Sequence, residues 1–151
     1  METIYALSSG RPPAAIAVVR ISGPSAFMAV EALTGDLPPP RHASLRTLRD
    51  EEGGTLDHAL VLTFPGPRTA TAENLAELHL HGGRAVVDAV LAYLSRVKNF
   101  RTALPGEFTR RALLNGRVDL AQAQGLADLL EAETDTARRA ALASTEGAVG
   151  R

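Results

Sequence analysis

The residues best suited to chemistry lie in one short segment, 77–83. Glu77, His79 and His81 alternate with leucines, and two glycines follow. Residues at every second position of a strand share a face, so this alternation places the carboxylate and both imidazoles on one side of a sheet. These are the ligand types of an open zinc site, and they support a metal-dependent hydrolase as one hypothesis. The simpler interpretation is a half-exposed strand whose polar residues lie in water.

The spacing along a strand argues against a single metal ion. Alternate positions are about 6.5–7 Å apart, whereas zinc ligands approach the ion to about 2 Å. The glycines offer another use of the same segment. Gly82 and Gly83 precede a predicted helix, and the free amides at a helix N-terminus attract anions and hydrogen-bonding ligands. A plain tight turn before a helix would have the same sequence.

Other charged residues are also candidates for a site. Arg20 ends an otherwise apolar run, where it lies either in water at the end of a strand or against a ligand or carboxylate. A second group lies on and just past one short predicted helix: Glu107, Arg110, Arg111 and Arg117. This group is either a solvated helix face with local ion pairs or a basic wall for carboxylates and phosphates.

Composition excludes several classes of protein. The 151 residues carry a formal net charge of −1, which gives no overall basic surface for nucleic acid. The absence of cysteine excludes disulfides, thiolate metal sites and cysteine nucleophiles from this sequence. Asn99 follows the only lysine, Lys98, so the sequence has no Walker A loop. Without a long apolar run or a secretory signal, we expect a cytoplasmic protein with no membrane contact.

Hydrophobic patterning predicts the elements that carry these residues. Strands are expected over 3–7, 14–21, 45–48, 56–64, 75–81 and 100–104. Helices are expected over about 25–33, 84–97 and 105–114. The connections around Gly53 and Pro65 are too short for crossover helices. We therefore expect an α+β fold, with packed helices on a mixed or mostly antiparallel sheet.

The pattern of the sequence changes at Asp119. From there apolar residues recur at helical spacing, and no strand signals remain. Two isolated helices would bury one face poorly, so they need partner helices from elsewhere. We interpret residues 119–151 as an all-helical segment that follows a first domain over 1–118.

Several segments, taken together, resemble those of the tRNA-modification GTPases known as MnmE or TrmE. They occur in the same order and extend over nearly the whole chain. The segments are SSGR at 8–11, VVRISGP at 18–24, FPGP at 64–67, TAENLAELHLHGG at 71–83, PGEFTRRA at 105–112 and LNGRVDLAQA at 114–123.

The resemblance implies a domain organisation and a function. Members of the family combine an N-terminal folate-binding domain with a helical domain, into which a GTPase domain is inserted. With the flavin-dependent partner MnmG they install a carboxymethylaminomethyl-type group at C5 of the tRNA wobble uridine. The folate-binding domain resembles that of the glycine-cleavage aminomethyltransferase and forms the homodimer. Residues 1–118 would then bind folate and dimerise, and 119–151 would begin the helical domain. The GTPase domain, with its GTP, Mg²⁺ and K⁺, would be absent from this chain.

The resemblance also assigns a binding site. The family's contacts to 5-formyltetrahydrofolate fall on Arg20, Glu77 and Arg117. A carboxylate can accept two N–H groups from a 2-aminopterin edge, and arginines suit carbonyls and carboxylates. The folate would donate the one-carbon unit that becomes the methylene at uridine C5. No catalytic residue and no GTP hydrolysis are expected of this chain alone.

The sequence departs from the family at three places. Ala72 stands where members often have glycine, and a positive φ there would strain it. Arg117 replaces a lysine of some members, and residues 11–14 replace a more glycine-rich loop. These departures leave a third hypothesis open, namely a dimerisation module that binds no ligand.

Overall fold

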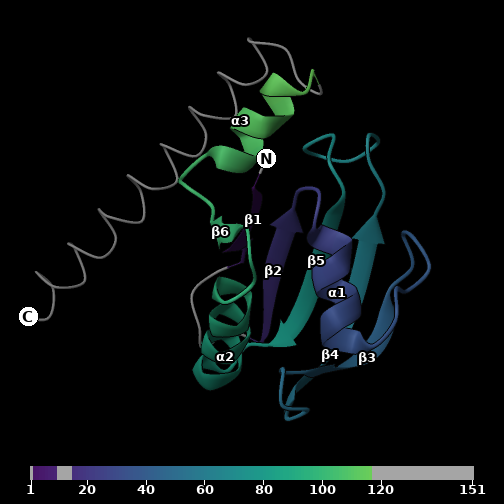
Figure 1. Cartoon of the computed structure of the whole chain (residues 1–151), viewed down its shortest axis with the longest axis vertical. Coiled ribbons are helices and arrows are strands. Elements are labelled where there is room, and N and C mark those ends of the chain that lie inside the picture. The colour runs from purple at the N-terminus through teal and green to yellow at the C-terminus, as the bar shows by residue number, and fades with distance from the viewer. Residues whose placement is uncertain (1, 10–14, 117–151) are drawn as a thin grey trace, which may run out of the picture.

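A six-stranded sheet organises the part of the chain that the structure, a computed structural model, describes: residues 2–9 and 15–116. The strands are β1 (Thr3–Leu7), β2 (Ile16–Ser22), β3 (Ser44–Arg49), β4 (Thr55–Phe64), β5 (Leu75–His81) and β6 (Phe100–Thr102). The helices are α1 (Ala26–Thr34), α2 (Arg84–Ser95) and α3 (Glu107–Leu114). The strand order is β3-β4-β5-β2-β1-β6, as Figure 1 shows. Neighbouring strands are antiparallel except β1 and β6, so the predicted α+β fold with a mixed sheet is confirmed.

The predicted and observed elements agree closely, and the main difference concerns β2. The apolar run at 14–21 predicts a strand that is buried throughout. In the structure β2 is buried on one face: Ile16 is 57% exposed, whereas Ala17 and Val19 are fully buried. The reason is that α1 and α2 both pack against the same side of the sheet, and their buried residues form one cluster with it.

The hydrophobic core lies between that side of the sheet and the two helices. Every second residue of the central strands faces it, and each helix contributes apolar residues at helical spacing. Strand residues in the core include Val19, Ile21, Leu48, Val61, Leu78 and Leu80. Helix residues in the core include Val30, Leu33, Val87, Val90 and Leu94. In Figure 1, α1 and α2 lie against the sheet, and α3 lies beyond its end.

The opposite side of the sheet is left uncovered by α1 and α2. It combines polar side chains with apolar ones that are unusually exposed: Leu45 is 67% exposed and Leu60 is 42% exposed. These two leucines are directly paired across β3 and β4. We call this surface, which carries Ile16, Arg20, Leu45, Leu60 and Glu77, the open face.

Part of the sequence-based prediction lies outside the residues that the structure describes. This applies to Arg117, to the boundary between 1–118 and 119–151, and to the helices expected after it. The departure at 11–14 also lies outside them. Within the described ranges, no helix combines the length and the apolar character needed to cross a membrane.

Replacing Leu78 by alanine should lower the free energy of unfolding by about 2–5 kcal/mol, because a fully buried side chain is lost from the core. The matched control is Leu37→Ala, between α1 and β3, where the leucine is 44% exposed. That change should cost less than about 1 kcal/mol. Urea unfolding followed by circular dichroism measures both. Equal losses would contradict the assignment of the core to the helix-covered side.

Candidate functional site

Arg20 and Glu77 meet on the open face, at the centre of the sheet. They occupy directly opposed positions of the antiparallel pair β2–β5. Nη2 of Arg20 donates a hydrogen bond to Oε2 of Glu77 at 2.9 Å. The sequence allows either water or a carboxylate as the neighbour of Arg20, and the structure shows the carboxylate. Two of the three predicted folate contacts are thereby brought together from distant parts of the chain.

Glu77 is kept ionised by the groups around it. Nε2 of His79 lies 3.0 Å from Oε1 of Glu77, so each carboxylate oxygen has one partner. Partial burial raises the pKa of Glu77, but the hydrogen bonds with His79 and Arg20 outweigh this effect and leave the pKa below its usual value. An ionised carboxylate has about four acceptor positions. Glu77 can therefore accept further N–H groups while it keeps both partners.

Arg20 also carries a donor without an acceptor. Among residues 2–9 and 15–116, its Nε is the one buried side-chain nitrogen or oxygen with no hydrogen-bond partner. Leaving a buried donor unpaired costs about 1–3 kcal/mol, and such groups in native proteins often have a functional reason. A ligand with an acceptor at this point would remove that cost.

A cavity of about 360 Å³ adjoins the ion pair. Its volume is in the range typical of small-molecule sites. Phe64 and Leu75 supply apolar wall, while arginines and a carboxylate supply charge. The lining residues are Arg20, Arg41, Phe64, Arg68, Thr69, Ala70, Leu75 and Glu77. The arrangement fits a flat ligand that has both hydrogen-bonding and charged groups.

The loop between β4 and β5 forms one wall of this cavity and is fixed by its own hydrogen bonds. Oδ1 of Asn74 accepts from the Gly66 amide at 2.9 Å, and Oγ1 of Thr69 donates to the Glu73 carbonyl at 2.6 Å. A Cβ at Gly66 would lie 3.0 Å from the backbone of Glu73, so a larger residue would crowd this turn. Ala72 has φ 62°, so the condition under which the sequence predicts strain there is met. A left-handed alanine costs about 1–3 kcal/mol.

The three residues of the hypothetical zinc site are not brought together. Glu77 contacts His79, but Nδ1 of His81 lies 2.8 Å from Oδ1 of Asp57, and its amide donates to Oδ2 of the same carboxylate. Within the part of the chain that is described, no group of three or more His, Cys, Asp or Glu side chains is placed to hold a metal ion. The shared strand face of segment 77–83 therefore does not produce a metal-binding cluster.

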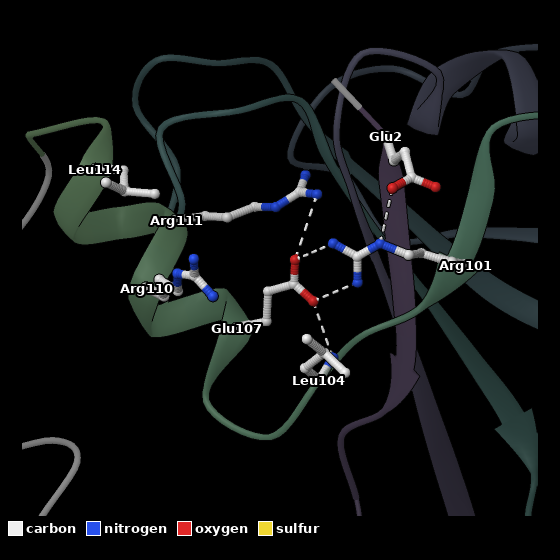
Figure 2. A pocket seen from close by; sticks show the side chains of 7 residues that line it. All are labelled: Glu2, Arg101, Leu104, Glu107, Arg110, Arg111 and Leu114. Atoms are coloured by element: carbon white, nitrogen blue, oxygen red, sulfur yellow. Dashed lines mark hydrogen bonds and ion pairs between the residues drawn. The ribbon is translucent and has the colours of Figure 1, made fainter.

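A second cluster of charges surrounds Glu107, the first residue of α3 (Figure 2). Its carboxylate accepts hydrogen bonds from Nη1 of Arg101 at 2.7 Å and from the Leu104 amide at 2.9 Å. Arg111 approaches the same carboxylate at 3.6 Å. Glu107 and Arg111 are only 7% and 5% exposed, so neither the solvated helix face nor the basic wall expected from the sequence is correct for them. They form a buried ion-pair network instead.

Arg111 extends this network to the cavity loop. Its Nη1 lies 3.2 Å from Oε1 of Glu73 and donates to the carbonyl of Ser22, at the end of β2. The Ser22 hydroxyl also donates to Glu73 at 2.8 Å. One turn later, Nδ2 of Asn115 donates to the Thr71 carbonyl at 2.9 Å. The C-terminal end of α3 is therefore attached to the loop that lines the cavity.

Sequence reasoning missed part of the cavity. Arg41 precedes β3, Phe64 is the last residue of β4, and Arg68 lies in the loop after it. Nothing in their local pattern marks them as site residues. Only the hairpin that joins β3 to β4 and the loop after Phe64 bring them beside Glu77. Arg117, the third predicted contact, lies outside the described residues.

Comparisons with known proteins point to one family. The family model described as "GTP-binding protein TrmE N-terminus" matches residues 3–117. The tRNA modification GTPase MnmE of Novosphingobium aromaticivorans is 62% identical over 151 residues, covering 99% of this chain and 35% of the relative. The protein of the same name from Erythrobacter litoralis is 60% identical over 147 residues, covering 97% of this chain and 35% of the relative. The chain thus spans about a third of the length of the curated relatives it matches.

Replacing Glu107 by glutamine should remove a pH-dependent part of the stability. The hydrogen bond from Arg101 outweighs burial and lowers the pKa of Glu107 from 4.5 to about 2. Because the folded-state pKa lies below the unfolded value, the ionised carboxylate stabilises the fold at neutral pH. This stabilisation is lost as the pH falls from about 4.5 towards 2. At pH 7 we expect it to amount to about 3 kcal/mol.

Urea unfolding of both proteins between pH 7 and pH 3 measures this effect. The difference in unfolding free energy between wild type and Glu107→Gln should be largest at pH 7 and should shrink as the solution becomes acidic. The control is Glu2→Gln, which removes the exposed partner of the same Arg101 and should cost less than about 1 kcal/mol. A difference that does not change with pH would contradict the role given to Glu107.

Proposed function

The chain belongs to the family described as the GTP-binding protein TrmE N-terminus, and on that premise we propose that its cavity binds a reduced folate. The ligand is a formyl- or methylene-tetrahydrofolate, such as 5-formyltetrahydrofolate. It serves as the one-carbon source when the whole protein modifies C5 of the tRNA wobble uridine. The observation that carries the proposal is the ion pair Arg20–Glu77, with an unpaired buried donor on Arg20, at the edge of a cavity of suitable size.

The residues of the cavity suit the parts of such a ligand. Glu77 is ionised and keeps acceptor positions for the donor-rich 2-aminopterin edge. The guanidinium of Arg20, whose Nε has no acceptor of its own, suits a carbonyl oxygen. Phe64 and Leu75 offer apolar surface to the flat ring system. When bound, the folate supplies the activated one-carbon unit. The residues of this chain bind it, orient it and exclude water from one side.

The activity of the whole protein forms the second part of the proposal. We infer a GTP hydrolase that acts in tRNA uridine modification in the cytoplasm, with tRNA and the flavin-dependent protein MnmG as partners. GTP, Mg²⁺ and K⁺ would bind to the GTPase domain of the whole protein. The names of the relatives, tRNA modification GTPase MnmE, support this inference. The likeness to the folate-binding domain of the glycine-cleavage aminomethyltransferase belongs to the same proposal.

We also propose that the chain forms a homodimer through the open face. Ile16, Leu45 and Leu60 expose large apolar side chains on this one side of the sheet. Exposed apolar residues that gather on one surface mark interaction sites more often than single ones do. A second copy packed on this face would remove them from water and would place the two cavities beside the interface.

Calorimetric titration with 5-formyltetrahydrofolate tests the binding site. Wild type should bind saturably, and Glu77→Gln should weaken binding by about tenfold or more, since a charge-assisted pair of hydrogen bonds is lost. The control Glu31→Gln removes an exposed carboxylate from α1, on the covered side of the sheet, and should change nothing. If Glu77→Gln binds as wild type does, Glu77 is not a contact. If folded wild type binds no folate, the proposal is wrong and a dimerisation module without ligand remains.

Sedimentation velocity tests the dimer. Replacing Leu60 by aspartate puts a charge among the exposed apolar residues of the open face and should shift the chain from dimer to monomer. Met28→Asp is the matched control, because Met28 is 54% exposed but belongs to α1 on the other side of the sheet. A monomeric wild type, or two variants that both remain dimeric, would contradict an interface on this face.

A further inference from the structure

The side of the cavity formed by the loop after β4 carries two further arginines, Arg41 and Arg68, which are linked by a hydrogen bond from Arg41 to the Arg68 carbonyl. Within the described part of the chain, neither Arg41 nor Arg68 forms an ion pair with a carboxylate. Glu77 is the only carboxylate among the lining residues, and it is already paired with Arg20. This end of the cavity is therefore a concentration of positive charge that has no internal counter-charge.

Arg41 is held in place by contacts with the cavity loop. Its Nη2 donates to the carbonyl of Arg68 at 2.8 Å, and its guanidinium carbon lies 5.8 Å from the centre of the Phe64 ring. Its backbone amide donates to the carbonyl of Thr63 at 2.7 Å. Because these contacts orient the guanidinium in advance, less freedom is lost when an anion binds.

Arg68 differs from Arg41 in that its side chain holds nothing in place. It is an exposed residue of the loop that follows the cis peptide bond Gly66–Pro67, and its carbonyl, not its side chain, contacts Arg41. Removing its charge should therefore leave the shape of the cavity unchanged. A substitution at Arg68 therefore tests the effect of positive charge on ligand binding without changing the shape of the cavity.

The two ends of the cavity differ in the chemistry that they can bind. The Glu77 end offers acceptors to a neutral, donor-rich group, whereas the Arg41 and Arg68 end attracts carboxylates. A ligand that spans the cavity must then be neutral at one end and anionic at the other. In a tetrahydrofolate the anionic end is the glutamate tail, whose negative charge grows with each added glutamate.

We propose that Arg41 and Arg68 bind the glutamate tail and that the chain selects tetrahydrofolates carrying several glutamates over those with one. This inference rests on the folate site proposed above. Each exposed ion pair contributes modestly and is screened by salt, so the preference should be about three- to tenfold at low salt and should shrink at high salt.

The experiment compares 5-formyltetrahydrofolate with one glutamate and with three, by calorimetric titration of this chain at low and at high salt. Wild type should favour the triglutamate. Arg68→Gln should bind both folates more weakly but should lose more affinity for the triglutamate, so that most of the preference disappears. The control Arg84→Gln makes the same change of charge at the exposed start of α2, outside the cavity lining, and should keep the full preference.

The outcomes separate this inference from the proposed function. If wild type binds both folates equally, or if Arg68→Gln prefers the triglutamate as strongly as wild type does, the tail site is wrong while the folate site stands. If Arg84→Gln loses the preference as well, overall charge and not a site explains it, and the inference fails. If wild type binds neither folate, the proposed function itself fails and the tail site fails with it.

Discussion

The site depends on an ion pair that the sheet places on its uncovered side. Arg20 and Glu77 are opposed in the two central strands, so the register of β2 and β5 sets their distance before any side chain moves. A one-residue slip of either strand would turn its charged residue into the core, against α1 and α2, where charges without full compensation are costly. The apolar residues that hold the register are thus also the ones that keep the charges accessible. Stability of the core and presence of the site are therefore linked.

A second set of charges connects the edge of the sheet with the cavity. Glu107 forms ion pairs with Arg101 of β6 and with Arg111 of its own helix. Arg111 also pairs with Glu73 and donates to the Ser22 carbonyl at the end of β2. Removing one member of such a buried network leaves the others with uncompensated charge. The network therefore fixes α3 and the loop after β4 relative to each other. The Asn115 contact to this loop makes the position of the loop depend on α3 as well.

Local patterns in the sequence were enough to predict most of the fold and to single out Arg20 and Glu77 as candidate residues. The alternation at Leu75–His81 predicts β5 with its observed bounds, and the alternatives weighed for Arg20 include the observed one. Predictions failed where the deciding partner is distant in sequence. His81 turns to Asp57 across the sheet, and the burial of Glu107 depends on Arg101 and on contacts that only the folded sheet provides. Sequence periodicity has no information on such pairs.

The distribution of charge in the cavity favours a bifunctional ligand over the other possibilities. A hydrolytic metal site needs ligands that converge on one point, and the described residues contain no such cluster. A surface used only for dimerisation has no need of a buried arginine donor without a partner. The overall charge of the chain is nearly balanced, so the positive end of the cavity is a local arrangement and not a consequence of composition. A cavity lined by one carboxylate and by two arginines that form no ion pair within residues 2–9 and 15–116 suits a ligand with a neutral, donor-rich head and an acidic tail.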